Sequence, residues 1–213
     1  EQALADRPLP DAESLHGRIA AARAIIATHR ADAPRVIEYA RHAISRLPST
    51  EPFVRSLTAF SLGDAHLLTG NVVSACAAFA DAVNSGLATG SLHMVAVSSA
   101  YLARTQMLCG RLREAERVCQ RALDLVAEVS EAPSRTVPTL GMLYAYLGQL
   151  RRELDDLEGA GRYLGQALEL GERSGYVEAL AASYWALAQL RRAERDLPSG
   201  LAMIERAIDT VRE

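Results

Sequence analysis

The sequence YLGQLRRELDDLEGA at residues 146–160 recurs as ALAQLRRAERDLPSG at residues 186–200, displaced by 40 residues. Both stretches contain QLRR followed by a charged, acidic turn and a second segment that begins with leucine. A catalytic site is normally built once in a domain, whereas a stacked structural unit is built several times. The similarity of the two stretches therefore indicates a repeat, and the rest of the chain should contain further copies of it.

Five segments of the chain align on this pattern, with spacings of 39, 40, 45 and 40 residues. They begin at Ala31, Gly70, Gly110, Asp155 and Arg195. The sixth residue of each segment is small or apolar: Val36, Ala75, Ala115, Ala160 and Gly200. The thirteenth residue is always alanine: Ala43, Ala82, Ala122, Ala167 and Ala207. Another small residue, often preceded by leucine, lies seven residues before each segment: Ala24, Gly63, Ala103, Gly148 and Ala188.

Each unit reads as two helices joined by a short turn, because apolar residues follow helical spacing and small residues let two backbones approach. One helical hairpin cannot bury its own apolar face, so neighbouring hairpins must stack. The predicted fold class is all-α, a right-handed superhelical array of about five antiparallel hairpins in a single domain spanning 1–213. A loop at 129–138 absorbs the longest spacing. The hairpins are expected near residues 11–48, 51–88, 90–128, 136–174 and 175–213.

Composition excludes several functional classes. The 213 residues are 49% apolar, enough for a core, and the net charge of −3 gives no general attraction to nucleic acid. No stretch approaches the roughly 18 consecutive apolar residues of a membrane span. We therefore expect no membrane and no direct nucleic-acid partner, and a cytoplasmic location. All 23 basic residues are arginine, so a cationic site here would use planar, bidentate groups.

Motifs for catalysis, metal binding or phosphate binding are missing from the sequence. There is no HExxH, no GxSxG and no GxxxxGK[ST], so we expect neither enzyme activity nor a cofactor. His66 takes a packing position and is expected in the core. Cys76 and Cys119 fall in apolar helical patterns that predict buried, reduced thiols. Cys109, beside the turn residue Gly110, is the one candidate for a reactive thiol.

The repeat resembles a tetratricopeptide array. The Leu-Gly or Leu-Ala pair, the turn glycine and both alanines of that family are present, and its aromatic residue appears as Tyr144 and Tyr184. The period of about 40 and the stretches LGDAHLLTGNVVSACAAFADAV (62–83) and CGRLREAERVCQRALDLVAE (109–128) resemble a narrower group. That group is the superhelical sensor domain of MalT-like, LuxR-family ATP-dependent transcriptional regulators.

The resemblance implies a segment that senses an inducer, and the start at Glu1 fits a piece of a larger chain. In that family an ATPase domain precedes the array and a helix-turn-helix DNA-binding domain follows it, so both are expected partners within one parent protein. In MalT itself the segment recognises a maltose-type oligosaccharide, which makes a sugar one candidate effector. A related array in large bacterial serine/threonine kinases leaves a kinase parent open.

The resemblance also places the first helix of each hairpin on the concave face. With the small residue of each Leu-Gly or Leu-Ala pair as reference, positions −3, +1 and +4 are predicted to face the groove. The −3 row is Ala21, Phe60, Ala100, Ala145 and Trp185. The candidate ligand or partner groove, drawn from the three rows, comprises Asp64, Arg104, Gln149, Arg152, Trp185, Gln189 and Arg192.

These residue types suit recognition, because arginine binds carboxylate, phosphate or sugar hydroxyls, glutamine donates and accepts, and tryptophan offers a flat surface. The first hypothesis is therefore a regulatory sensor that binds a small-molecule effector in the groove. The second is an interaction scaffold that recognises a peptide, an acidic segment or another protein domain. A homodimer through a terminal repeat is the third. Against all three stands a solvated face, with the arginines paired to Asp155, Asp156 and Glu194.

Overall fold

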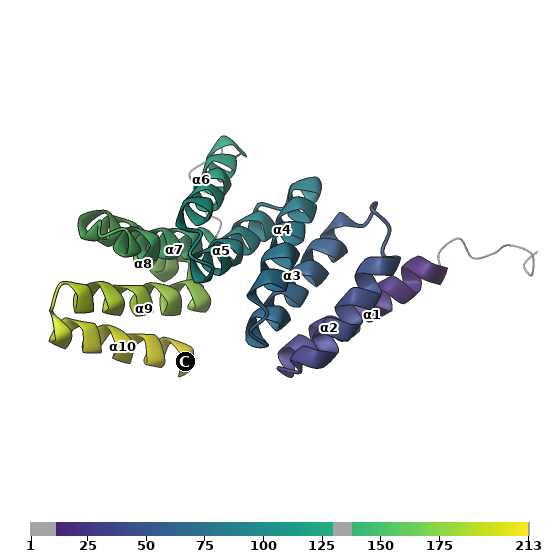
Figure 1. The fold of residues 1–213 in the computed structure, drawn as a ribbon, viewed down its shortest axis with the longest axis horizontal. Helices are drawn as coiled ribbons and strands as arrows, with labels where there is room; N and C mark the ends of the chain where they lie inside the picture. The colour runs from purple at the N-terminus through teal and green to yellow at the C-terminus, as the bar shows by residue number, and fades with distance from the viewer. Residues whose placement is uncertain (1–11, 130–137, 213) are drawn as a thin grey trace, which may run out of the picture. The chain divides into compact units, whose positions relative to one another are not determined.

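The computed structural model describes residues 12–129 and 138–212, and this part of the chain contains ten α-helices in consecutive pairs (Figure 1). The helices are α1 (Ala12–His29), α2 (Ala33–Arg46), α3 (Pro52–Leu68), α4 (Val72–Thr89), α5 (Leu92–Leu108), α6 (Leu112–Val129), α7 (Leu140–Glu153), α8 (Leu157–Ser174), α9 (Val177–Ala193) and α10 (Leu197–Arg212). The predicted all-α class with five helical hairpins is confirmed. Most of the predicted loop at 129–138 lies outside the described residues.

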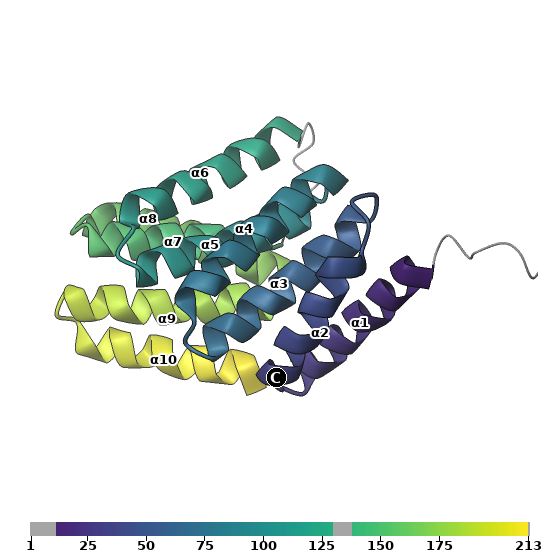
Figure 2. The same ribbon diagram turned by 45° about the vertical axis from the view of Figure 1, so that its right-hand side comes forward.

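The chain divides into two compact units, residues 1–94 and 95–213, and we describe each by itself. In the first unit α1 packs on α2, α3 packs on α4, and α2 packs on α3, which joins the two hairpins. In the second unit α7 packs on α8, α9 packs on α10, and α9 also contacts both α7 and α8. The α9–α10 pair lies side by side in Figures 1 and 2. Both units therefore combine pairing within a hairpin and stacking between hairpins.

Small residues at the reference position allow the close approach of the two helices in a hairpin. A Cβ atom built on Gly148 of α7 would lie 2.5 Å from Cγ of Leu164 on α8. A Cβ atom on Gly63 of α3 would lie 2.8 Å from the ring of Phe79 on α4. Leu164 and Phe79 are fully buried. The glycine leaves the space that one large side chain of the partner helix fills.

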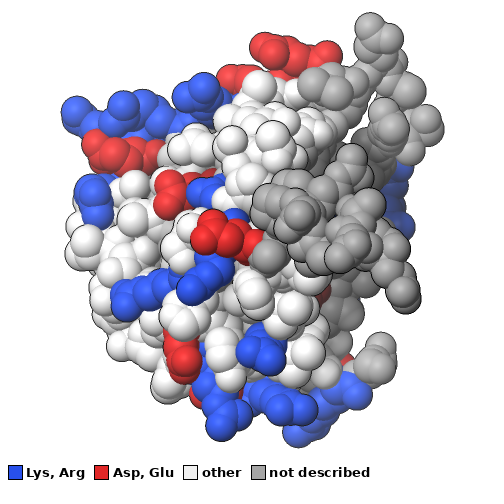
Figure 3. Space-filling view, turned by 90° about the vertical axis from the view of Figure 1, so that its right-hand side faces the viewer, with Lys and Arg blue, Asp and Glu red and all other residues white. Residues whose placement is uncertain are grey.

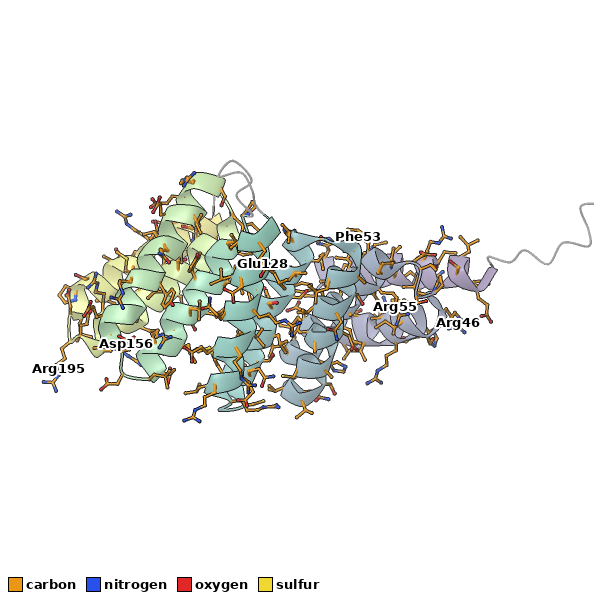
Figure 4. All side chains as sticks on the ribbon, turned by 90° about the horizontal axis from the view of Figure 1, so that it is seen from above. Arg46, Phe53, Arg55, Glu128, Asp156 and Arg195 are labelled. Carbon is orange, nitrogen blue, oxygen red and sulfur yellow. The ribbon has the colours of Figure 1, made fainter. Side chains whose placement is uncertain are left out.

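The turn inside each hairpin has the same backbone conformation at its first residue. That residue has positive φ in all five: Ala31 (53°), Gly70 (76°), Gly110 (72°), Asp155 (62°) and Arg195 (65°). These are the residues on which the five sequence segments align. Figure 4 shows Arg195 projecting from the α9–α10 turn and Asp156 at the α7–α8 turn. The repeat spacing therefore marks a left-handed turn position that then leads into the second helix.

The substitution Ala31→Gly is expected to stabilise the chain by about 0.5–1 kcal/mol. A left-handed conformation costs an alanine about 1–2 kcal/mol, and glycine avoids this cost. Glycine also loses more conformational entropy on folding than alanine, which offsets part of the gain. Urea unfolding followed by circular dichroism measures the change.

The matched control is Gly70→Ala at the same turn position of the next hairpin. A Cβ atom there would meet nothing within 4 Å, so only the backbone strain at φ 76° is added. We expect a loss of about 1 kcal/mol. Equal effects of the two substitutions would contradict a shared left-handed position.

Helix α4 bears on the expectation that the chain contains no membrane span. Its 18 residues have a mean hydropathy of 1.3, and by length and composition alone they would suffice to cross a membrane. Asp81 is the only charged residue of this helix. In the structure α4 is the second helix of a hairpin, with Cys76, Phe79 and Ala82 buried against its neighbours. The core helix of a hairpin array passes the same composition test, so this finding is weak evidence for a span.

Candidate ligand-binding site

The second unit carries six of the seven predicted groove residues on three first helices. Arg104 lies on α5 and is exposed, while Gln149 and Arg152 lie on α7 and are half-buried. Trp185, Gln189 and Arg192 lie on α9 at spacings of four and three residues, so they share one helical face. Because α7 packs directly on α9, the residues of these two helices belong to neighbouring strips of surface. We call the set Arg104, Gln149, Arg152, Trp185, Gln189 and Arg192 the polar row.

The QLRR motif has one packing residue and two kinds of arginine. Leu150 and Leu190 are each only 1% exposed, which confirms that the leucine packs in the core. The first arginine is tied down: Arg151 pairs with Glu116 of α6, and Arg191 pairs with Glu194 at 2.7 Å. The first arginine of each motif is therefore paired with an acidic side chain.

The second arginine of each motif differs, and it belongs to the polar row. Arg152 pairs only with its chain neighbour Glu153, at 2.5 Å, and Arg192 makes no ion pair within the described residues. Two acidic residues suggested as partners serve other roles. Asp156 accepts a hydrogen bond from the Gly159 amide at 2.8 Å as the cap of α8, and Asp155 forms the turn.

One hydrogen-bond donor of Arg152 also lacks an acceptor among the described residues. Its Nε is buried and has no hydrogen-bond partner in the structure as described. An unpaired buried donor on a charged group costs free energy, because the group has lost water without gaining another acceptor. An oxygen acceptor supplied by a bound molecule would satisfy it.

Arg104 lies near a buried tyrosine of the next first helix. Tyr146 on α7 is 6% exposed, and its phenol lies near enough to Arg104 to feel the charge of the guanidinium. Burial raises the pKa of Tyr146, and Arg104 partly opposes that rise. Burial, followed by Glu178 and Tyr146, raises the pKa of Tyr176 to about 12. Both tyrosines thus stay neutral at physiological pH.

The prediction that the whole −3 row faces an open groove is wrong. Ala21, Ala100 and Ala145 are buried, and Phe60 packs on Phe79 with ring centroids 5.5 Å apart. This row lies where neighbouring helices cover it: a Cβ atom on Gly141, one turn before Ala145, would lie 3.1 Å from Cβ of Ala179 on α9. Trp185 stands out in the row because it is 53% exposed.

Asp64, the remaining predicted residue, lies on α3 in the first unit and is half-buried. It lines a small cleft between α1 and α3 together with Thr28 and Leu68. It belongs to the first unit and is therefore described apart from the polar row.

Other chemically distinctive side chains are structural. His66 is buried, and burial followed by Arg41 lowers its pKa, which confirms the expected core position. Cys76 and Cys119 are buried as predicted, and Cys109 is half-buried. Across residues 12–129 and 138–212, no group of three histidine, cysteine, aspartate or glutamate side chains has the arrangement of a metal site.

Repeated helical hairpins with left-handed turns and a row of polar residues on their first helices define a tetratricopeptide-like repeat protein, a class that binds partners and carries no catalytic machinery of its own. Residues 17–213 match the family described as the MalT-like TPR region. The chain therefore belongs to this family. A comparison with curated proteins gave no match.

Solved structures show the same fold at low sequence identity. The Rap protein complexed with Competence and Sporulation Factor is similar with a TM-score of 0.72 and 14% identity, over 93% of this chain and 54% of that one. BtubC from P. vanneervenii is similar with a TM-score of 0.63 and 18% identity, over 89% of this chain and 77% of that one. A putative kinesin light chain from Podosopora anserina gives 0.56 and 18%, with 92% of each chain covered.

Proposed function

We propose that this chain is the signal-sensing region of a bacterial transcriptional regulator of the MalT-like, LuxR-family type. Its membership of the MalT-like TPR family supports this proposal. In such a regulator the region acts in the cytoplasm, between the ATPase and DNA-binding domains of the same parent chain. Its own part is recognition, and the output belongs to those domains.

The observation that carries the proposal is the pair Arg152 and Arg192. They occupy equivalent positions on α7 and α9, and one has a buried Nε without a partner while the other has no ion pair in the described chain. Guanidinium groups form strong, bidentate hydrogen bonds to carboxylate and phosphate. The polar row therefore favours an effector that carries a carboxylate or phosphate group over a neutral sugar.

The row also suggests how binding reaches the rest of the protein. α7 and α9 belong to successive hairpins of the second unit, so an anion held by both Arg152 and Arg192 bridges two stacked hairpins. A ligand shifts a conformational equilibrium only when it binds one state more tightly. Here the favoured state is the one in which the stacking of the two hairpins brings both arginines to the same anion.

A protein or peptide ligand is the second candidate, and it is favoured by a likeness of fold. The similar Rap protein was solved in complex with Competence and Sporulation Factor. An acidic segment would use the same arginines and would also contact Trp185. The two candidates differ in ligand size but share the same anionic chemistry.

A thermal-shift screen followed by calorimetry tests the proposal, with small carboxylates, phosphates, oligosaccharides and acidic peptides as probes. A ligand at about 100 times its dissociation constant adds about 2.7 kcal/mol, which raises Tm by roughly 5–10 °C for a chain of this size. We expect Arg152→Ala and Arg192→Ala each to weaken binding by about 10- to 100-fold, since each removes a charge-assisted hydrogen bond.

Arg162→Ala is the matched control, because Arg162 is exposed on the second helix α8 and pairs with Glu158 at 3.3 Å. It should bind as the unmodified chain does. A ligand that still binds both variants at full affinity, or one that binds only through the control position, would remove the polar row as the site. A rise in Tm with acidic peptides alone would select the second candidate.

A further inference from the structure

A polar cleft lies inside the first unit, between α2, α3 and α4. Its volume is about 160 Å³, and its lining residues are Ile44 of α2, Arg55 and Ala59 of α3, and Asp81, Asn84 and Ser85 of α4. The three helices pack on one another, α2 on α3 and α3 on α4. A cavity of about 150 Å³ holds a benzene molecule, so this cleft has room for one aromatic ring.

The cleft lies where a tyrosine ring lies in the second unit. The position four residues before the small reference residue is Tyr144 in α7 and Tyr184 in α9, but Ala59 in α3. Tyr144 stacks on Tyr163 of α8, with ring centroids 6.2 Å apart. Tyr184 is 6% exposed, and the guanidinium of Arg206 lies 6.0 Å from its ring centroid. The methyl group of an alanine is too small to fill the same space, so a ring-sized volume stays open in α3.

Asp81 takes the position of the cation that covers the tyrosine ring of α9. Asp81 and Arg206 are both the twelfth residue of their repeat segments. Asp81 is exposed, and its carboxylate forms no hydrogen bond or ion pair within residues 12–129 and 138–212. The side chains of Asn84 and Ser85, one turn further along α4, also have no hydrogen-bond partner in the described part of the chain. Three polar side chains thus line the cleft without partners from the protein.

Arg55 supplies the positive charge of the cleft (Figure 4). Its Nη1 donates hydrogen bonds to the backbone oxygens of Ile44 at 3.1 Å and Leu47 at 2.7 Å. These bonds hold the guanidinium at the C-terminal end of α2, while Nε and Nη2 keep donors for a ligand. Arg55 is half-buried and has no ion pair with an acidic residue of the described helices.

The charges of the cleft select the kind of ligand. One guanidinium and one carboxylate match the two charges of a zwitterion, and neither is neutralised by the other at ion-pair distance. Figure 3 looks onto the first unit, where arginine and acidic side chains are interspersed with uncharged surface. A surface of mixed sign does not attract a large ligand of one charge. A small molecule that carries both charges and one ring fits these observations.

We propose that this cleft binds a free aromatic α-amino acid. The ring of the ligand takes the space that a tyrosine side chain fills in the second unit, against Ala59 and Ile44. Its carboxylate accepts hydrogen bonds from Arg55, and its ammonium group donates to Asp81. The site belongs to the first unit alone and does not depend on the polar row.

Isothermal titration calorimetry of the full chain tests the proposal, with L-phenylalanine and L-tyrosine as probes. Three analogues each lack one feature of the ligand. Phenethylamine lacks the carboxylate, 3-phenylpropanoate lacks the ammonium group, and L-alanine lacks the ring. Each analogue should bind about 10-fold or more weakly than L-phenylalanine, because each loses one charge-assisted hydrogen bond or the burial of the ring.

Two variants locate the site. Ala59→Tyr places in the cleft the ring that Tyr184 holds in α9, so it should keep the helical circular dichroism and abolish binding. Asp81→Asn should weaken binding of L-phenylalanine by about 10-fold or more, since it removes the charge that meets the ammonium group. Asp124→Asn is the matched control, because Asp124 is exposed on α6 and accepts a hydrogen bond from Gln120 at 2.8 Å. The control should bind L-phenylalanine as the unmodified chain does.

Nuclear magnetic resonance gives a direct readout of position, because the ring of a bound ligand should shift the methyl signals of Ala59 and Ile44. The proposal is overturned if neither aromatic amino acid binds, or if L-alanine or 3-phenylpropanoate binds as tightly as L-phenylalanine. Full affinity in a folded Ala59→Tyr chain would also overturn it. If that variant loses its helices, Asp81→Asn and the methyl shifts decide the matter, since Asp81 is exposed and its substitution leaves the packing unchanged.

Discussion

Replacing Leu164 with alanine should lower the free energy of unfolding by about 2–5 kcal/mol. Leu164 lies at the centre of the second unit, with no exposed surface, and contacts both Ala186 and Leu190 of the next hairpin. Its loss leaves a cavity between three helices, and packed backbones can close such a cavity only in part. Because α7 and α9 both rest on α8, the loss also loosens the contact that supports the polar row.

Gly148 lies opposite Leu164 and allows a second test of the same contact. Gly148→Ala alone should cost about 1–3 kcal/mol, because its Cβ atom would lie 2.5 Å from Cγ of a leucine that has no room to move. In the double variant Gly148→Ala/Leu164→Ala the new methyl group occupies part of the vacated space. The combined loss should therefore fall below the sum of the single losses by at least about 1 kcal/mol.

Gly165→Ala is the control on the same helix. A Cβ atom at Gly165 meets nothing within 4 Å, so the substitution should stabilise α8 by about 0.5–1 kcal/mol through helix propensity alone. Urea unfolding curves of the four variants give the values. Strict additivity of Gly148→Ala and Leu164→Ala would contradict the direct contact between these two positions.

The repeat spacing allowed much of this fold to be predicted, because each aligned position has one physical task. Gly148 must be small where Leu164 crosses, and Asp155 must adopt a left-handed turn. These tasks depend on residues nearby in the chain and recur in every hairpin. The sequence therefore shows each of these requirements five times, once in every hairpin.

The contacts of the polar row could not be predicted from the sequence, because they depend on residues of different hairpins. Tyr146 lies near Arg104, and Arg151 pairs with Glu116, so both contacts join side chains of successive hairpins. Periodicity assigns a face to a residue but does not say how far the next hairpin covers that face. That is why Ala145 was expected in the groove and is buried, while Trp185 at the same position is exposed.

Alkaline pH should destabilise the second unit through one buried thiol. Burial, with a smaller effect of Glu116, raises the pKa of Cys119 from 9.0 to about 12. The folded chain then holds this proton more tightly than the unfolded chain. The stabilisation is complete below pH 9, and it is lost at about 1.4 kcal/mol per pH unit as the pH rises toward 12. At pH 11 the loss should reach about 2.7 kcal/mol.

Cys119→Ala isolates this contribution. The variant should lose about 1 kcal/mol at pH 7, because a buried sulfur atom is removed, and then fall less steeply with pH than the unmodified chain. The two stability curves should cross between pH 9 and pH 11.

Cys109→Ala, at a half-buried position beside a turn, should keep the steep slope. Unfolding by urea under reducing conditions at each pH measures the slopes. Burial raises the pKa of Tyr146 and Tyr176 in every variant, so this contribution of burial is shared by the curves that are compared. Equal slopes for both cysteine variants would show that the thiol of Cys119 reaches water, and the close packing of α6 inferred from its burial would then be wrong.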